Sequence, residues 1–178
     1  NLTTNLEPIA IISKLEELHA QGLSIPVRIH DACFTSEVLG SLKCDCKQQL
    51  DYAKNYIQKH GGVLIYLQQE GRGIGLANKI AAYSLQEQGL DTVEANRALH
   101  LPDDARDYHD AVAILHDLGI SKIELLTNNP RKIQKLEELG IEITKRLPIQ
   151  VPSSSISHPY LRAKAEQMGH LLDIPEDS

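Results

Sequence analysis

Hydrophobic positions along the chain switch repeatedly between the spacing of a helix and that of a strand. Apolar residues from Ile9 to Leu18 fall at helical spacing and stop at Gly22, which predicts an N-terminal helix with a glycine cap. A short strand is predicted at 25–29, and the continuous apolar run at 63–67 is typical of a strand covered on both faces. Helices and strands therefore alternate from the start of the chain.

The same alternation continues to residue 172. Predicted helices lie at 45–59, 76–88, 111–118, 130–140 and 158–172, and predicted strands at 92–96, 122–127 and 141–149. This order predicts a mixed α/β fold: one layered domain with a partly parallel sheet flanked by helices. In such a domain, ligands are expected at the ends of the strands.

Composition narrows the class of protein. A chain of 178 residues that is 42% hydrophobic fits one domain with a sizeable core. Its apolar runs are shorter than the roughly 20 residues that span a bilayer, so no membrane association is expected. A net charge of -6 argues against binding long nucleic acid. Three cysteines, an odd number, argue against a disulfide framework and for a reducing compartment, with the cytoplasm as the expected location.

All three cysteines lie within fourteen positions, at Cys33, Cys44 and Cys46. This Cys-x10-Cys-x-Cys spacing offers three thiolate ligands, and a catalytic zinc site uses three protein ligands with the fourth position open. The alternative is that the three residues are buried and behave as small hydrophobic side chains. Because they are clustered rather than scattered, the spacing favours an open zinc site.

The strand at 63–67 leads into a glycine-rich loop, Gln68 to Gly75, and then into a helix, an arrangement that can bind anions. The loop lacks both the Gly-x-Gly-x-x-Gly pattern and a Gly-Lys-Ser/Thr motif, which excludes a P-loop. A tight turn is the alternative interpretation. Arg72 favours a phosphate or pyrophosphate site, because its guanidinium can grip phosphate at two points. The Glu70 carboxylate could accept hydrogen bonds from a guanine edge.

Other polar positions leave two interpretations open. Asp104 and Arg106 precede a predicted helix and suit helix capping and catalysis equally well, whereas Asp107 is expected to cap. Tyr83 has the periodicity of a core residue. Lys132 lies in the first turn of a helix, where a cation opposes the helix dipole, and this hints at a bound anion.

Taken together, these segments resemble the GTP cyclohydrolase II family, which opens riboflavin biosynthesis. The match runs from about Arg28 to Leu172. The residues that carry it are Arg28-Ile29-His30, Cys33, Ser41 to Cys46, Gln69 to Arg72, Ile74 to Leu76, Asn78 to Ile80, Asp91 to Asn96, Arg106 to Tyr108, Leu125 to Pro130, Lys164 to Glu166 and Met168 to Leu172.

The resemblance implies an activity and a set of site residues. It implies hydrolysis of GTP to 2,5-diamino-6-(5-phosphoribosylamino)pyrimidin-4-one, with zinc on Cys33, Cys44 and Cys46 activating water against C8 of guanine, and with release of formate and pyrophosphate. It also implies Mg²⁺ on the triphosphate and a homodimer. The implied catalytic residues are Arg106 as nucleophile toward the α-phosphorus, Asp104 as proton acceptor, and Tyr83 in ring opening, against its periodicity. The implied GTP contacts are Arg28, Ile29, His30, Asp31, Ala32, Gln49, Glu70, Gly71, Arg72, Thr92, Thr127 and Lys132.

The chain also departs from the family pattern. Asp31-Ala32 stands where the family has Ser-Glu, and Lys47 stands where it has Gly; both changes are expected to touch the substrate pocket or the zinc surroundings. Residues 1–27 are predicted to be helical instead of strand-rich, residues 28–172 to form the catalytic domain, and residues 173–178 to be a tail. Three explanations stay open: a paralogue with an altered product or purine nucleotide substrate, a catalytically silent nucleotide-binding regulator, or a chain that begins inside a longer protein.

Overall fold

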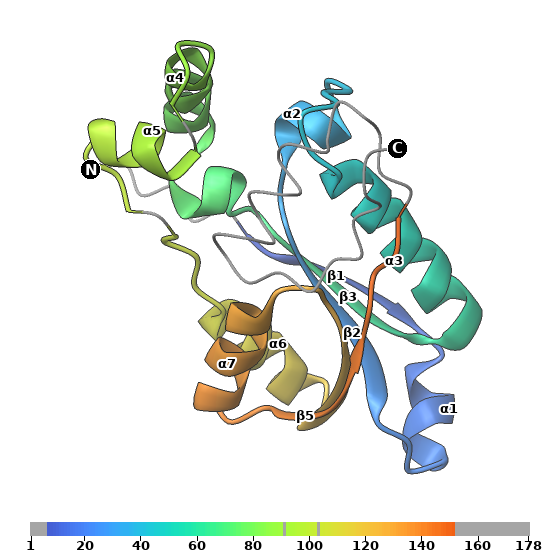
Figure 1. The fold of residues 1–178 in the computed structure, drawn as a ribbon. Helices are drawn as coiled ribbons and strands as arrows, with labels where there is room; N and C mark the ends of the chain where they lie inside the picture. The colour runs from blue at the N-terminus through green and yellow to red at the C-terminus, as the bar shows by residue number, and fades with distance from the viewer. Residues whose placement is uncertain (1–6, 91, 103, 152–178) are drawn as a thin grey trace, which may run out of the picture.

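One mixed sheet forms the centre of the computed structural model, which describes residues 7–90, 92–102 and 104–151 (Figure 1). Within this part of the chain the strand order is β1-β3-β2-β4-β5. Only β1 runs antiparallel to its neighbour; the other pairs are parallel, which confirms the predicted α/β class. The strands are β1 Ile9–Ser13, β2 Ile25–Asp31, β3 Gly62–Leu67, β4 Lys122–Leu126 and β5 Glu142–Leu147.

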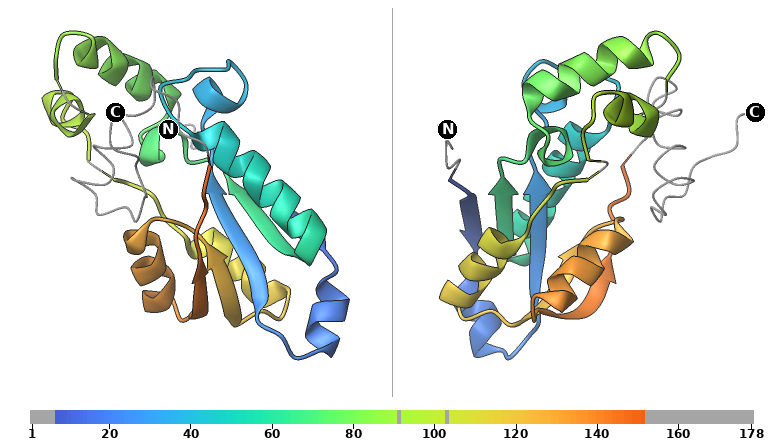
Figure 2. Two further views of the ribbon diagram at one scale, coloured as in Figure 1. Left: turned by 45° about the vertical axis from the view of Figure 1, so that its right-hand side comes forward. Right: turned by 90° about the vertical axis from the view of Figure 1, so that its left-hand side faces the viewer.

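Helices cover both faces of this sheet. Helix α3 packs on one face, whereas α6 and α7 lie on the other, and α4 and α5 contact each other beyond the strand ends (Figures 1 and 2). This arrangement leaves the ends of β2 and β3 facing α2 and α4. The helices are α1 Leu15–Ala20, α2 Phe34–Glu37, α3 Cys46–His60, the 3-10 turn η1 Glu70–Gly73, α4 Leu76–Gln86, α5 Thr92–Ala98, α6 His109–Asp117 and α7 Pro130–Glu138.

The alternation of side chains along the strands divides the core in two. Val27, Ile29 and Ile65 belong to the larger cluster under α6 and α7, and Leu64 belongs to the smaller cluster under α3. Successive residues of a strand point to opposite faces, so β2 turns Arg28 and His30 toward the α3 face. Both side chains are buried there, at 6% and 2% exposure. A buried arginine and a buried histidine need hydrogen-bond partners, and the partners of these two residues lie near the candidate site.

The N-terminal prediction is wrong in part. Residues Ile9–Ser13 form β1, which pairs with β3 from Ile9 opposite Tyr66 to Ser13 opposite Gly62; the predicted helix starts only at Leu15. The closely spaced isoleucines fit a strand as well as a helix, and pairing with β3 decides between them. The predicted boundary between residues 27 and 28 falls inside β2. The division of the chain into domains stays a prediction.

A second prediction is also wrong, at residues 92–96. This segment begins helix α5, Thr92–Ala98, which contacts α4, so helix packing overrides a short run that was assigned to a strand. The remaining predicted strands and helices within the described residues are confirmed, with shifts at their ends. The terminal helix predicted at 158–172 and the tail at 173–178 lie outside the described residues.

Candidate metal and nucleotide site

The three cysteine side chains meet beyond the end of β2. Cys33 precedes α2, and Cys44 and Cys46 lie on either side of Asp45, the N-cap residue of α3. Their sulfur atoms all lie within 4.8 Å of one another, and Cys33 Sγ is 3.6 Å from Cys44 Sγ. Sulfur ligands of a tetrahedral zinc ion, with bonds of about 2.3 Å, are about 3.8 Å apart. The donor set therefore fits zinc with one coordination position left over.

A cation sits against this thiol cluster. Lys79 Nζ lies 3.1 Å from Cys33 Sγ and 2.7 Å from Glu70 Oε1. The pKa of Cys33 lies far below its ordinary value because the thiols of Cys44 and Cys46 donate to its sulfur and Lys79 is close. Burial alone would lower the pKa of Lys79, but its bonds to Glu70 and Cys33 outweigh burial and raise it. Lys79 is thus a permanent positive charge that joins the thiol cluster to Glu70.

Tyr83 lies one helical turn after Lys79, on the same side of α4. Its hydroxyl is 3.5 Å from Thr35 Oγ1, which in turn is 3.7 Å from Cys33 Sγ. Burial raises the pKa of Tyr83, so the phenol keeps its proton. The interpretation of Tyr83 as a core residue is wrong, because the side chain is only partly buried and faces the cysteines. Its catalytic role stays a prediction.

The backbone φ is positive at four residues of the glycine-rich loop: Gly71, Arg72, Gly73 and Gly75. Gly71 has φ 62 and Arg72 has φ 61, and for a non-glycine residue this conformation costs roughly 1–2 kcal/mol. Such strain is concentrated at functional sites. Glu70 accepts from the backbone N–H groups of Phe34 and Gly71 in addition to Lys79. Arg72, by contrast, has no side-chain hydrogen bond to another described residue, so its guanidinium is available to an anion.

Asp31 connects two cations at the end of β2. Its Oδ2 atom accepts from Lys132 Nζ at 2.9 Å and from Arg106 NH1 at 3.1 Å. Arg106 also binds Asp104 through Nε at 2.9 Å and NH2 at 2.6 Å. Lys132 further donates to the carbonyl oxygen of Ile29. Four of the residues implied by the family resemblance therefore form one ion-pair cluster.

The charges in this cluster fix its protonation states. Burial opposes ionisation of Asp104, but the hydrogen bonds from Arg106 lower its pKa to about 2. The pKa of Arg106 is raised, because bonds to Asp104 outweigh its burial. Burial lowers the pKa of Lys132 to about 8, although Asp31 opposes this shift. Arg106 is a firmly protonated cation, whereas Lys132 titrates close to neutral pH.

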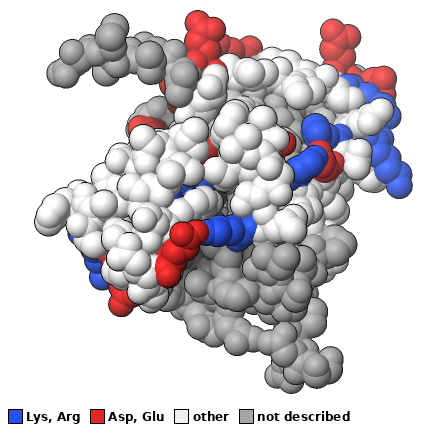
Figure 3. Space-filling model, turned by 90° about the horizontal axis from the view of Figure 1, so that it is seen from above, with Lys and Arg blue, Asp and Glu red and all other residues white. Residues whose placement is uncertain are grey.

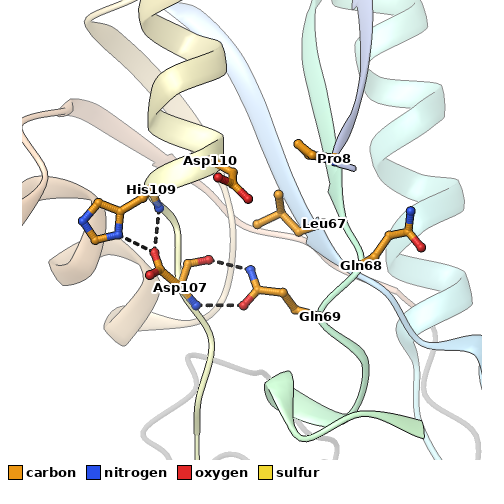
Figure 4. A pocket seen from close by; sticks show the side chains of 7 residues that line it. All are labelled: Pro8, Leu67, Gln68, Gln69, Asp107, His109 and Asp110. Atoms are coloured by element: carbon orange, nitrogen blue, oxygen red, sulfur yellow. Dashed lines mark hydrogen bonds and ion pairs between the residues drawn. The ribbon is translucent and has the colours of Figure 1, made fainter. Parts of the chain in front are cut away.

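Gln69 holds the glycine-rich loop against the segment that carries Arg106. Its side-chain amide donates to the carbonyl oxygen of Asp107, and its Oε1 accepts from the N–H of Asp107 at 2.7 Å (Figure 4). The N–H of Ala105 adds a bond of 3.0 Å to the carbonyl of Arg72. A pocket of about 180 Å³ lies beside the bonds between Gln69 and Asp107. It is lined by Pro8, Leu67, Gln68, Gln69, Asp107, His109 and Asp110.

Several predicted GTP contacts lie inside the protein. Arg28 donates to Leu126 O, His30 Nδ1 and Gln49 Oε1, so most of its N–H groups serve the fold. Thr127 is buried, and its hydroxyl accepts from the N–H of Asn129. The predicted contacts that lie together around the strand ends are Asp31, Ala32, Glu70, Gly71, Arg72 and Lys132. Thr92 begins α5.

Comparison with known proteins decides the family. The family model described as GTP cyclohydrolase II matches residues 1–148. The chain belongs to the GTP cyclohydrolase II family. It is 53% identical over 150 residues to the GTP cyclohydrolase-2 of Campylobacter fetus, covering 84% of this chain and 76% of that protein. It is 55% identical over 149 residues to the GTP cyclohydrolase-2 of Picrophilus torridus, covering 83% and 78%.

Longer proteins also match. The riboflavin biosynthesis protein RibBA of Bacillus mycoides is 51% identical over 154 residues, which are 86% of this chain but only 39% of that protein. The family match begins at residue 1 and so includes residues 1–27, the N-terminal segment predicted to depart from the family pattern. Members of the GTP cyclohydrolase II family are enzymes. Among the described residues of this member, none of the helices has the length and apolar character needed to cross a bilayer.

The two departures from the family pattern lie in different surroundings. Asp31 occupies the ion-pair cluster described above. The side chain of Lys47 points to solvent and pairs with Asp51 at 2.7 Å, while its backbone N–H donates to Ser36 Oγ at 3.2 Å. The side chain of Lys47 therefore does not reach the thiol cluster, contrary to expectation. At residues 31–32 one carboxylate is gained and one is lost relative to the family pattern, so the charge is kept but its position moves by one residue.

Three residues of the site were not identified from sequence. Lys79 and Glu37 contact Cys33 directly, and Gln69 binds the backbone of Asp107, the residue after Arg106. A signal for Lys79 existed, since it lies four residues before Tyr83 on one helix face and residues at this spacing are neighbours. Gln69 and Glu37 bind backbone groups, and which backbone groups a side chain reaches depends on the tertiary fold.

One face of the molecular surface shows how the charged groups are distributed. Figure 3 views the end of the molecule that carries α2 and α4, and on the described part of this face acidic and basic groups are scattered over a mostly uncharged surface.

Proposed function

We propose that this chain is a zinc-dependent hydrolase that opens the imidazole ring of GTP, releases formate and pyrophosphate, and gives 2,5-diamino-6-(5-phosphoribosylamino)pyrimidin-4-one. The observation that carries the proposal is the cluster of three thiols, one ligand fewer than a tetrahedral zinc ion takes, with Tyr83 and the Glu70–Lys79 pair beside it. Family membership supports the same reaction.

At the guanine end, Cys33, Cys44 and Cys46 would hold the metal. Zinc, when bound, supplies a Lewis acid that makes water a nucleophile near neutral pH. Tyr83 remains protonated because it is partly buried, and can donate a proton as the ring opens. Glu70 is proposed to read the guanine edge. To do so, its carboxylate must exchange one of its present backbone donors for an N–H of the base.

At the phosphate end, Arg72, Arg106 and Lys132 supply positive charge, and Mg²⁺ would accompany the triphosphate. The firm protonation of Arg106 suits stabilisation of negative charge better than nucleophilic attack, because a guanidinium must lose a proton to become a nucleophile. Asp104 is ionised and can accept a proton only when Arg106 moves away from it. The remaining proposed GTP contacts are Arg28, Ile29, His30, Asp31, Ala32, Gln49, Gly71, Thr92 and Thr127.

The test is to incubate zinc-loaded protein with GTP and Mg²⁺ and to measure formate, pyrophosphate and the absorbance of the product. One zinc per chain and equal amounts of formate and pyrophosphate are expected. If protein that retains its zinc gives no turnover, the proposal is wrong. We also propose a homodimer and a cytoplasmic location, which sedimentation and cell fractionation would test.

Asp31 favours a second candidate, a related enzyme with a different product or purine nucleotide. Its carboxylate already occupies the space between Arg106 and Lys132, two cations proposed to face phosphate. An enzyme that stops after opening the ring would keep the formyl carbon in its product, so the absorbance would change although neither formate nor pyrophosphate is released. A silent regulator, the third possibility, would bind GTP and release neither product.

A further inference from the structure

Glu37, the last residue of α2, places its carboxylate between the metal cluster and the interior of the sheet. Its Oε1 atom accepts from the backbone N–H of Cys33 at 2.9 Å and lies 2.9 Å from His30 Nε2. Its Oε2 atom accepts from the hydroxyl of Tyr66 at 2.7 Å. The side chain is 8% exposed. A buried carboxylate with three donors is a rigid anchor, and one of these donors belongs to a cysteine of the thiol cluster.

The contact with His30 has a defined direction. Arg28 has donors but no acceptor, so its NH2 group, 3.1 Å from His30 Nδ1, must donate to that nitrogen. A neutral imidazole then carries its hydrogen on Nε2, and this hydrogen points at Glu37. Burial lowers the pKa of His30, in keeping with the neutral ring. The bonds therefore run in one direction, from Arg28 through His30 to Glu37.

The same chain of bonds extends to the other two cysteines. Arg28 NH2 also donates to Gln49 Oε1 at 3.0 Å, and Gln49 Nε2 donates to Asp45 Oδ2 at 2.7 Å. Asp45 is the residue between Cys44 and Cys46, and it is 3% exposed. One buried network thus begins at the N–H of Cys33 and ends at the turn that carries the other two thiols.

We infer that Glu37 is a positioning residue for the three-cysteine site, which holds the Cys33 turn ready for a metal ion and connects it through His30, Arg28 and Gln49 to the Asp45 turn. The inference rests on the metal-binding part of the proposed function and not on any reaction with GTP. Partners of this kind around metal ligands commonly change metal affinity by about 10- to 100-fold when they are removed.

Two substitutions separate positioning from general support of the fold. Glu37→Ala leaves the N–H of Cys33 and the ring of His30 without an acceptor, so zinc should dissociate about 10- to 100-fold faster. Glu37→Gln keeps an oxygen for these two donors but loses its charge, so its rate should lie between those of Glu37→Ala and the unmodified protein. Tyr66→Phe removes only the bond on the far side of the carboxylate and should release zinc at the unmodified rate. Glu17→Ala changes an exposed glutamate of α1 and serves as a matched control.

The experiment measures transfer of zinc from the zinc-loaded protein to a chromophoric chelator, together with the thermal unfolding of each variant. Cobalt-loaded protein adds a spectrum, because a loosened Cys33 turn should weaken the thiolate-to-cobalt charge-transfer band in Glu37→Ala and leave it unchanged in Tyr66→Phe. If Glu37→Ala does not fold, the rate of zinc release from Glu37→Gln tests the inference instead.

Release of zinc at the unmodified rate by the folded Glu37 variants, with unchanged cobalt spectra, overturns the inference. The inference is also overturned if Tyr66→Phe accelerates zinc release as much as the Glu37 variants do. These outcomes are separate from failure of the proposed function: protein that holds zinc but does not turn over GTP refutes the reaction and leaves the role of Glu37 open to this test.

Discussion

Adding one methyl group at Gly73 should disturb the segment that carries Arg106. Gly73 has φ +87, and a Cβ built there lies 3.0 Å from the carbonyl carbon and oxygen of Ala105 and 3.2 Å from the N–H nitrogen of Arg106. Ordinary contacts of a Cβ begin at 3.4 Å, so Gly73→Ala requires a displacement of about 0.4 Å. The contacted atoms are backbone, which cannot rotate aside as a flexible side chain would.

The displacement should reach Arg106 because the segment is held on both sides of it. Ala105 is bonded to the carbonyl of Arg72, and Asp107 is clamped by Gln69. A misplacement of 1 Å can reduce turnover about 100-fold, so a displacement of about 0.4 Å should reduce it by roughly sixfold. The left-handed backbone adds about 1–2 kcal/mol of strain to the folded state.

Gly75→Ala provides the control. Gly75 has φ +86 and ψ 164, a backbone that is also strained for alanine, but a Cβ there meets no atom within 4 Å. Urea denaturation should show that both variants lose stability, and formate release per folded molecule should fall only in Gly73→Ala. Equal turnover by the two folded variants would refute the argument that the Ala105 contact positions Arg106.

Three further predictions follow from the site and its supports. The affinity of the protein for inorganic tripolyphosphate should fall as the pH rises through about 8. The cause is Lys132, which faces Asp31, Arg106 and Arg28, has a pKa of about 8 and loses its positive charge there. Calorimetry of Lys132→Met should show an affinity that no longer depends on pH in this range. Cys44→Ser should reduce zinc stoichiometry measured by atomic absorption, since a hydroxyl is a poorer zinc ligand than a thiolate, and retention of a full equivalent would contradict the three-thiol site. Asn129→Ala should lower the free energy of unfolding by about 1 kcal/mol, because Asn129 Oδ1 caps α7 by accepting from Arg131 N–H at 3.0 Å; thermal denaturation with no loss would show that the cap is replaced by water.

Local sequence was sufficient for the parts of the fold that depend on short-range rules. The glycine stop after α3 and the Asn129-Pro130 start of α7 each follow from backbone preferences of one or two residues. The thiol cluster was also predictable, since its three residues lie close together in the chain. The strand β1 was not, because its isoleucines fit two periodicities and only pairing with β3 chooses between them.

The ion-pair cluster illustrates the limit for the site. Asp31 and Lys132 are 101 positions apart, and Asp31 and Arg106 are 75 apart, so no local pattern could show that one carboxylate binds both cations. The place of Lys132 in the first turn of a helix hints at a nearby anion, but it does not show that the side chain is only 4% exposed or that its pKa is about 8. Burial, which creates this shift, comes from packing between distant segments.

The strand β1 also matters for how the chain can be shortened. It lies antiparallel along β3 and covers a row of backbone N–H and C=O groups that would otherwise form the edge of the sheet. The glycine-rich loop begins directly after β3. A chain trimmed to start after Ser13 would keep all three cysteines yet expose β3 to pairing with another molecule. Self-association of such a chain, rather than loss of zinc, is therefore its expected defect.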